Sequence, residues 1–179
     1  MSGLCDSSRS TLIVIDLQER LMPAIHDGSE VIRRAKILAQ AAKILAVPVI
    51  GTAQSAARLG PNVAEISAYL DQTLAKDSFN SCAAAEFLAA LPDSRGELIV
   101  SGCEAHVCVL QTVLGLLRRE YKVKLVADAV GSRRPFDKAV ALDRAAAAGA
   151  EIVTTEMVVF EWLRDSNHAE FRQLLALVK

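Results

Sequence analysis

Short apolar runs alternate along this chain with longer segments in which apolar residues recur every three or four positions. The short runs predict buried strands, over residues 11–15, 47–50, 72–75, 98–100, 123–127 and 152–154. The longer segments predict helices, over residues 29–46, 83–91, 107–120, 137–148, 158–163 and 169–177. The alternation indicates βαβ units, and therefore an α/β fold whose parallel sheet is covered on both faces.

Two local features refine this prediction. Ser29 is a plausible N-cap for the helix that follows it, because a serine oxygen can accept a hydrogen bond from the free N–H groups of the first turn. Residues 52–62 are polar and contain Gly60-Pro61, which predicts a long loop.

The stretch LIVSGCEAHVCVLQT, residues 98–112, has the parts of a nucleophile site. A buried strand ends at Ser101-Gly102, and Cys108 then falls in the first turn of the next helix. Unpaired N–H groups and the helix dipole favour an anion there, so we expect this thiol to ionise more easily than a free one. The alternative is an inert core cysteine, which is the more common fate of a buried thiol.

Candidate partners for Cys108 lie at the ends of other predicted strands. Asp16 follows the first strand and Lys76 follows the third. Ligands of open parallel sheets bind beyond the carboxyl ends of the strands, so Asp16 and Cys108 face each other if their strands are neighbours. A carboxylate could take the thiol proton, and an ammonium could hold the thiolate. The alternatives are a turn-capping Asp16 and a solvated Lys76.

Composition narrows the possible partners. The chain has 179 residues, of which 52% are hydrophobic, and its mean hydropathy of +0.29 is high enough to suggest a buried surface between subunits of a homo-oligomer. The formal net charge of -1 provides no electrostatic footprint for nucleic acid. We therefore expect no nucleic-acid partner.

The apolar segments and the cysteines indicate the cell compartment. The apolar region 35–53 is interrupted by Lys36, Gln40, Lys43 and Pro48, so no membrane span is expected. The first ten residues lack a basic region followed by an apolar core, so no secretory signal is expected. The four cysteines show no metal-ligand spacing. A reduced, zinc-free, cytoplasmic protein is the default.

Three ordered motifs make the chain resemble the isochorismatase-like cysteine hydrolase superfamily, which includes nicotinamidases and N-carbamoylsarcosine amidases. They are IDLQERLMP around Asp16, AKDSFNSC around Lys76 and SGCEAHVCVLQT around Cys108, and DAVGSR and TEMVVFEWL follow further along. The resemblance implies a three-layer α-β-α Rossmann-like fold with a mainly parallel six-stranded sheet in the order 3-2-1-4-5-6. It also implies a single domain over residues 11–179 after an N-terminal extension, residues 1–10.

The resemblance assigns roles to individual residues. Asp16, Lys76 and Cys108 match the family's catalytic triad. A cis peptide precedes the nucleophile in the family, here Cys103–Glu104, and would aim the N–H groups of Glu104 and Cys108 into an oxyanion hole. The candidate substrate-binding residues are Gln18, Gln54, Phe79 and His106.

The expected chemistry is cleavage of a small amide or related acyl compound through a thioester on Cys108, without a cofactor. Residues 52–55 lack the Asp and His ligands of metal-dependent nicotinamidases, so no metal is expected. Ala53 and Ser55 replace a glutamate and a tyrosine of closer relatives. These replacements leave a catalytically silent binding or scaffold protein as the alternative function. A thiol redox role for Cys103 and Cys108 is a further alternative.

Overall fold

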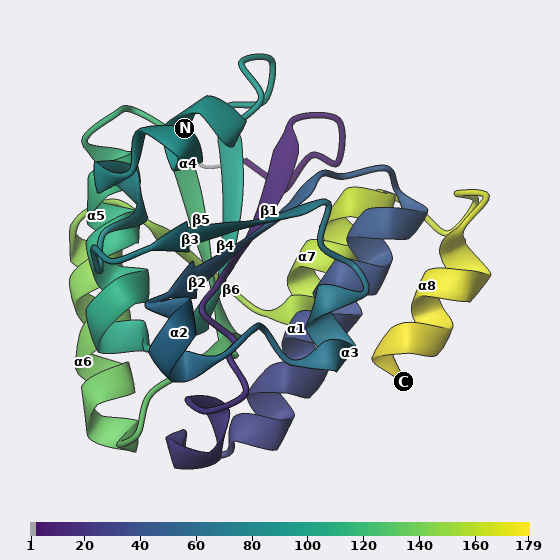
Figure 1. Ribbon diagram of the computed structural model, residues 1–179. Helices are drawn as coiled ribbons and strands as arrows, with labels where there is room; N and C mark the ends of the chain where they lie inside the picture. The colour runs from purple at the N-terminus through teal and green to yellow at the C-terminus, as the bar shows by residue number, and fades with distance from the viewer. Residues whose placement is uncertain (1–2) are drawn as a thin grey trace.

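The computed structural model describes residues 3–179 as alternating strands and helices (Figure 1). The strands are β1 (Ser10–Ile15), β2 (Val49–Gln54), β3 (Gln72–Lys76), β4 (Glu97–Cys103), β5 (Lys122–Gly131) and β6 (Glu151–Val153). The helices are α1 (Gly28–Ile44), α2 (Ala56–Leu59), α3 (Ala64–Ser67), α4 (Ala85–Ala90), α5 (Leu110–Leu117), α6 (Pro135–Ala147), α7 (Thr155–Leu163) and α8 (Phe171–Val178).

The six strands form one parallel sheet in the order β3-β2-β1-β4-β5-β6, which confirms the predicted fold class and strand order. Helices α1, α7 and α8 cover one face, and α4, α5 and α6 cover the other (Figure 1). Alternate residues of β1 serve the two faces, because successive side chains of a strand point in opposite directions. Leu12 and Val14 pack in one apolar core, whereas Ile13 and Ile15 pack in the other.

Several predicted boundaries are corrected by the structure. Residues 52–54, expected in a loop, extend β2, because β2 is hydrogen-bonded between β1 and β3 and the ladder continues through Gln54↔Lys76. The residue at the N-cap position of α1 is Asp27 rather than Ser29, and it makes no side-chain cap. Strand β5 runs on to Gly131. At the ends of β2 and β5, hydrogen bonding to the adjacent strands decides where the strand stops, and local composition does not.

Gly102 lets the end of β4 approach the end of β1. Its φ is +118°, in a region that side chains disfavour. A Cβ atom at this position would lie 2.0 Å from the carbonyl oxygen of Ile15. A glycine is therefore needed where the chain turns from β4 towards Cys108, directly beside Asp16.

The N-terminal segment lies against the domain as far as it is described. Ser10 is the first residue of β1, Cys5 is fully buried, and Lys124 Nζ donates a hydrogen bond to the carbonyl of Gly3. Residues 1 and 2 of the predicted extension lie outside the described residues, and the domain boundaries stay a prediction.

Candidate active site

Asp16 lies at the carboxyl end of β1, fully buried. Its φ of 50° turns the chain away from the sheet. Thr52 Oγ1 on β2 donates a 2.7 Å hydrogen bond to Asp16 Oδ1, and Lys76 Nζ on β3 lies 2.7 Å from Asp16 Oδ2. Both carboxylate oxygens are therefore held by side chains of β2 and β3, and the turn-capping alternative is wrong.

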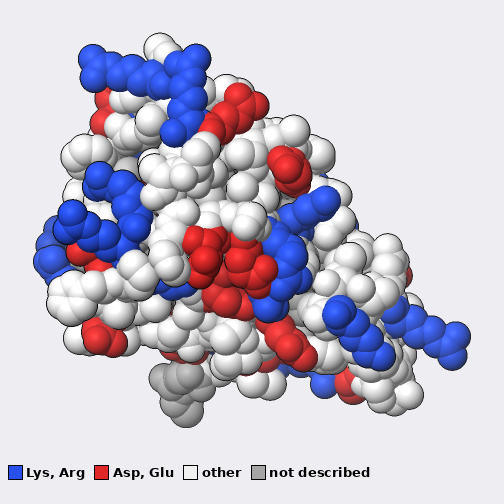
Figure 2. Space-filling model, turned by 90° about the horizontal axis from the view of Figure 1, so that it is seen from below, with Lys and Arg blue, Asp and Glu red and all other residues white. Residues whose placement is uncertain are grey.

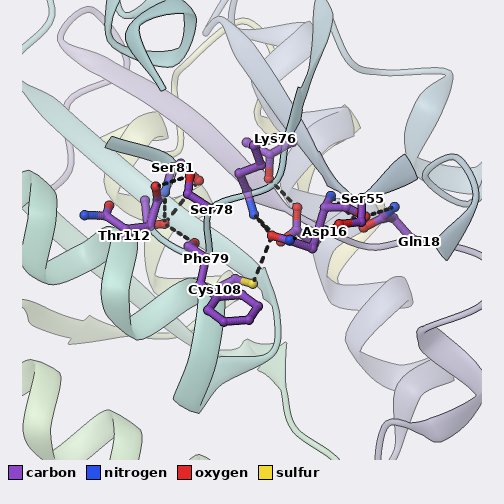
Figure 3. A network of polar contacts seen from close by, with 12 residues as sticks. Asp16, Gln18, Ser55, Lys76, Ser78, Phe79, Ser81, Cys108 and Thr112 are labelled. Atoms are coloured by element: carbon purple, nitrogen blue, oxygen red, sulfur yellow. Dashed lines mark hydrogen bonds and ion pairs between the residues drawn. The ribbon is translucent and has the colours of Figure 1, made fainter. Parts of the chain in front are cut away.

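Lys76 is the last residue of β3, and its side chain is 2% exposed. Besides the ion pair with Asp16, its ammonium donates a 3.0 Å hydrogen bond to Gln54 Oε1. The alternative of a solvated surface lysine is therefore wrong. Three adjacent strands bring Asp16, Gln54 and Lys76 together at the carboxyl edge of the sheet, and Figure 3 shows Asp16 and Lys76 pointing towards each other.

Cys108 faces this group from the other side of the β1–β4 junction (Figure 3). It lies in a π-helical turn, Ala105–Val109, that leads into α5. It is 6% exposed, and its Sγ is 3.9 Å from Gln54 Oε1, to which it donates a weak hydrogen bond. The Cys103–Glu104 peptide bond before this turn is cis, as the family resemblance implied.

The pKa of Cys108 is shifted upwards, whereas the sequence-based expectation was a shift downwards. Burial raises the pKa of this thiol to about 12, and the negative charge of Asp16 acts in the same direction. The ammonium of Lys76 lowers this pKa, but by less than burial raises it. The expectation considered the start of the helix and left out the loss of solvent, which disfavours any buried charge. Burial and the charge of Asp16 thus favour the neutral form of the Cys108 thiol.

The two candidate glutamines have different surroundings. Gln18 Oε1 accepts a hydrogen bond from the backbone N–H of Gln54 at 2.9 Å, and Gln18 Nε2 donates to the carbonyls of Gln54 and Gly60 at 3.1 Å and 2.6 Å. Its amide therefore joins the loop after β1 to β2. Gln54 Nε2 donates to the carbonyl of Asp77 at 2.7 Å, which leaves its Oε1 directed towards Lys76 and Cys108.

The other predicted site residues lie around this centre. Phe79 is 51% exposed, and its side chain extends towards Cys108 (Figure 3). His106 Nδ1 is 3.0 Å from Ser132 Oγ, so the imidazole is engaged away from the triad. The Glu104 carboxylate accepts from Arg133 Nε at 2.9 Å. The oxyanion hole and the substrate contacts stay predictions.

Thr52 and Thr112 are polar site residues that the sequence reasoning missed. Thr52 holds Asp16, and the buried hydroxyl of Thr112 holds the loop that follows Lys76. A longer β2 would have indicated Thr52, since residues two apart on a strand share a face and Gln54 was already a candidate. Ser55 also joins the network: its Oγ accepts from Gln54 Nε2 at 3.3 Å and lies 3.1 Å from Asp77 Oδ1.

Two structural features are absent from residues 3–179. No group of three or more His, Cys, Asp or Glu side chains there is placed to hold a metal ion. Within the same residues, no helix combines the length and apolar character needed to cross a bilayer.

The charge distribution near the carboxyl edge of the sheet is mixed. The face seen from below in Figure 2 has acidic and basic side chains next to one another. Glu30 pairs with Arg33 at 2.6 Å and with Arg34 at 2.7 Å. Arg34 Nε is also 3.7 Å from Asp128. These arginines are therefore not available as a free basic patch.

Comparison with known proteins places the chain among its relatives. The sequence profile of the isochorismatase domain matches residues 10–157. The secreted isochorismatase effector Isc1 of Phytophthora sojae is 34% identical over 180 residues, which cover 95% of this chain and 84% of Isc1. Because that relative is named as secreted, the cytoplasmic location of this chain stays a prediction.

Solved structures share the fold over nearly the whole chain. MAR1 ribonuclease from Caenorhabditis elegans is 33% identical, with a TM-score of 0.93 over 98% of this chain and 92% of its own. YcaC from Pseudomonas aeruginosa, solved with hexane-2,5-diol and covalent acrylamide, is 25% identical, with a TM-score of 0.92 over 99% of this chain and 92% of its own. YcaC from Escherichia coli, described as an octameric hydrolase of unknown specificity, is 24% identical, with a TM-score of 0.87 over 98% and 96%.

Proposed function

The chain belongs to the isochorismatase family, and from that premise we propose that it is a cysteine hydrolase that cleaves a small amide through a thioester on Cys108. The observation that carries the proposal is the buried ion pair of Asp16 and Lys76 beside the Cys108 thiol. Burying such a pair seldom adds stability over apolar residues of the same size. A buried, charged pair next to a nucleophilic side chain is typical of a catalytic site.

The mechanism begins from the neutral thiol. Asp16 takes the proton from Sγ as the sulfur attacks the substrate carbonyl carbon, and the ammonium of Lys76 offsets the negative charge that passes to sulfur. The carbonyl oxygen becomes an oxyanion held by the backbone N–H groups of Glu104 and Cys108. Each such donor contributes about 3 kcal/mol in comparable enzymes.

The second half of the reaction returns the enzyme to its starting state. The C–N bond breaks as protonated Asp16 gives its proton to the leaving nitrogen, which leaves a thioester on Cys108. Asp16 then takes a proton from a water molecule as the water oxygen attacks the thioester carbon. The C–S bond breaks, the acid departs, and the proton on Asp16 returns to the thiolate.

The proposal is tested with a panel of small amides and the corresponding esters. We expect product release by the wild type and by Cys5→Ser, a control that changes a buried cysteine outside the site, but none by Cys108→Ser. Intact-mass spectrometry of the wild type during turnover should detect the acyl adduct on Cys108. Turnover that survives in Cys108→Ser would contradict the mechanism.

The silent-scaffold alternative has its own expected result. Acrylamide is bound covalently in the P. aeruginosa YcaC structure, and it is a small amide that adds to thiols. If this chain hydrolyses no member of the panel and Cys108 also forms no acrylamide adduct, the scaffold function is favoured.

A homo-oligomer is part of the proposal. Phe136 and Val140, one turn apart on α6, are 76% and 49% exposed, and exposed apolar side chains of this size often mark an interface. E. coli YcaC is octameric. We expect sedimentation velocity to show an assembly at micromolar concentration that Phe136→Glu dissociates. Leu4→Glu, which changes an exposed leucine of the N-terminal segment, should leave it intact. A wild-type monomer would contradict this part.

A further inference from the structure

The loop between β3 and α4 is fastened to the helix that follows the nucleophile. Thr112 and Ser81 are both fully buried. The backbone N–H of Ser81 donates a 3.0 Å hydrogen bond to Thr112 Oγ1, and the two hydroxyl oxygens are 3.1 Å apart. The Thr112 hydroxyl is also 3.5 Å from the carbonyl oxygen of Phe79 (Figure 3). One side chain on α5 thus holds the loop at both Phe79 and Ser81.

Gly115 allows the same loop to lie close against α5. A Cβ atom at Gly115 would be 2.7 Å from Asn80 Oδ1 and 3.1 Å from Cys82 Sγ. Asn80 Oδ1 in turn accepts a 2.9 Å hydrogen bond from the backbone N–H of Cys82. The loop therefore fits the helix surface because position 115 has no side chain.

Helical spacing connects this attachment to the reaction centre. Thr112 and Gly115 are three residues apart on α5, so they lie along one face of that helix. Cys108 lies in the π-helical turn that leads into α5, four residues before Thr112. The helix to which the loop is fastened thus continues the turn that bears the sulfur. The Phe79 ring, half exposed, extends from this loop towards the sulfur (Figure 3).

We propose that Thr112 is a positioning residue that selects which acyl groups reach Cys108, acting through Phe79. The inference rests on the proposed function and adds the substrate class: amides whose acyl part has a flat or apolar substituent that packs on the Phe79 ring. An aromatic ring offers such a group a large apolar face and favours offset or edge-to-face stacking. The hydroxyl of Thr112 fixes the backbone from which this ring projects.

Two thiol probes that differ in one group test the proposal. Iodoacetamide and 2-iodo-N-phenylacetamide share a reactive carbon, but only the second has a phenyl group. Peptide mass mapping gives the labelling rate of Cys108 with each. The quantity compared is the labelling rate with 2-iodo-N-phenylacetamide divided by the rate with iodoacetamide. We expect Thr112→Val to lower this ratio about fivefold, which corresponds to the loss of one ordinary buried hydrogen bond. Thr112→Ser, which keeps the hydroxyl, should retain the wild-type ratio.

A double-variant comparison separates positioning from general loosening of the fold. Phe79→Ala should lower the same ratio, and adding Thr112→Val to Phe79→Ala should lower it no further, because the two residues act as one unit. If Thr112→Val does not fold, Gly115→Ala serves instead, since its Cβ atom displaces Asn80 and the loop. A reactive Cys108 with an unchanged ratio in these variants overturns this inference alone. An inert Cys108 in the wild type overturns the proposed function together with it.

Discussion

Replacing Asp16 with Asn should make Cys108 alkylate faster at neutral pH and, in the same variant, end turnover. The carboxylate of Asp16 is one of the two main causes that raise the pKa of the Cys108 thiol, the other being burial. Asparagine is nearly the same size and has no charge, so Lys76 is left to favour the thiolate. The thiol pKa should therefore fall from about 12. The thiolate form then becomes populated at a lower pH than in the wild type.

The size of this effect follows from two opposing terms. Each unit by which the pKa falls gives about tenfold more thiolate at a pH well below the pKa. A less basic thiolate is also less nucleophilic, and this loss cancels roughly half of the gain on a logarithmic scale. The labelling rate should therefore rise about threefold per unit of pKa. Turnover should fall at least about 10²-fold, because the variant has no group at this position to move the proton.

The measurement is the rate of iodoacetamide labelling of Cys108 over a pH series, combined with a turnover assay. Wild-type labelling should keep rising with pH across the whole range in which the protein stays folded, because the thiol pKa is about 12. The Asp16→Asn profile should be shifted to lower pH. Asp93→Asn, the same change at an exposed carboxylate outside the site, should leave both readings unchanged. Slower labelling in Asp16→Asn would mean that Asp16 activates the thiol towards any electrophile.

The sequence predicted the sheet well because its signals are local and repeated. The apolar runs at residues 11–15 and 98–100 are typical of buried strands, and Gly102 indicates the break that follows the second run. The strand order brought Asp16 and the Cys108 turn together. Strand ends were less predictable: Thr52 and Gln54 look like loop residues until β3 pairs with them.

The acidity of Cys108 could not be predicted from its position in the chain. Position indicates a helix start, but the pKa depends on how much water the fold removes and on which charges face the sulfur. Here burial raises the pKa of Cys108 by more than Lys76 lowers it. The ammonium of Lys76 is already paired with Asp16. The Thr112 attachment was equally invisible, because it joins a helix to a loop 31 positions away. Such contacts depend on packing between elements.

Replacing Lys76 with Met should destabilise the fold by about 3–5 kcal/mol, the usual cost of leaving one member of a buried ion pair without its partner. The carboxylate of Asp16 is fully buried, and the variant leaves it with the Thr52 hydroxyl as a donor but no neighbouring cation to offset its charge within the described site. Methionine is close to lysine in length, so loss of packing contributes little.

The free energy of unfolding in urea gives the measurement, and the surface pair of Lys43 and Asp71 gives a matched control. Those side chains are 38% and 47% exposed, so Lys43→Met should cost no more than about 1 kcal/mol. The double variant Asp16→Asn, Lys76→Met removes both buried charges and should be more stable than Lys76→Met alone, because the cost arises from the unpaired charge. Equal stabilities for Lys76→Met and Lys43→Met would show that the buried pair contributes no more than an exposed one. The Asp16 carboxylate would then bear no unpaired buried charge in Lys76→Met, which contradicts the buried ion pair described at this site.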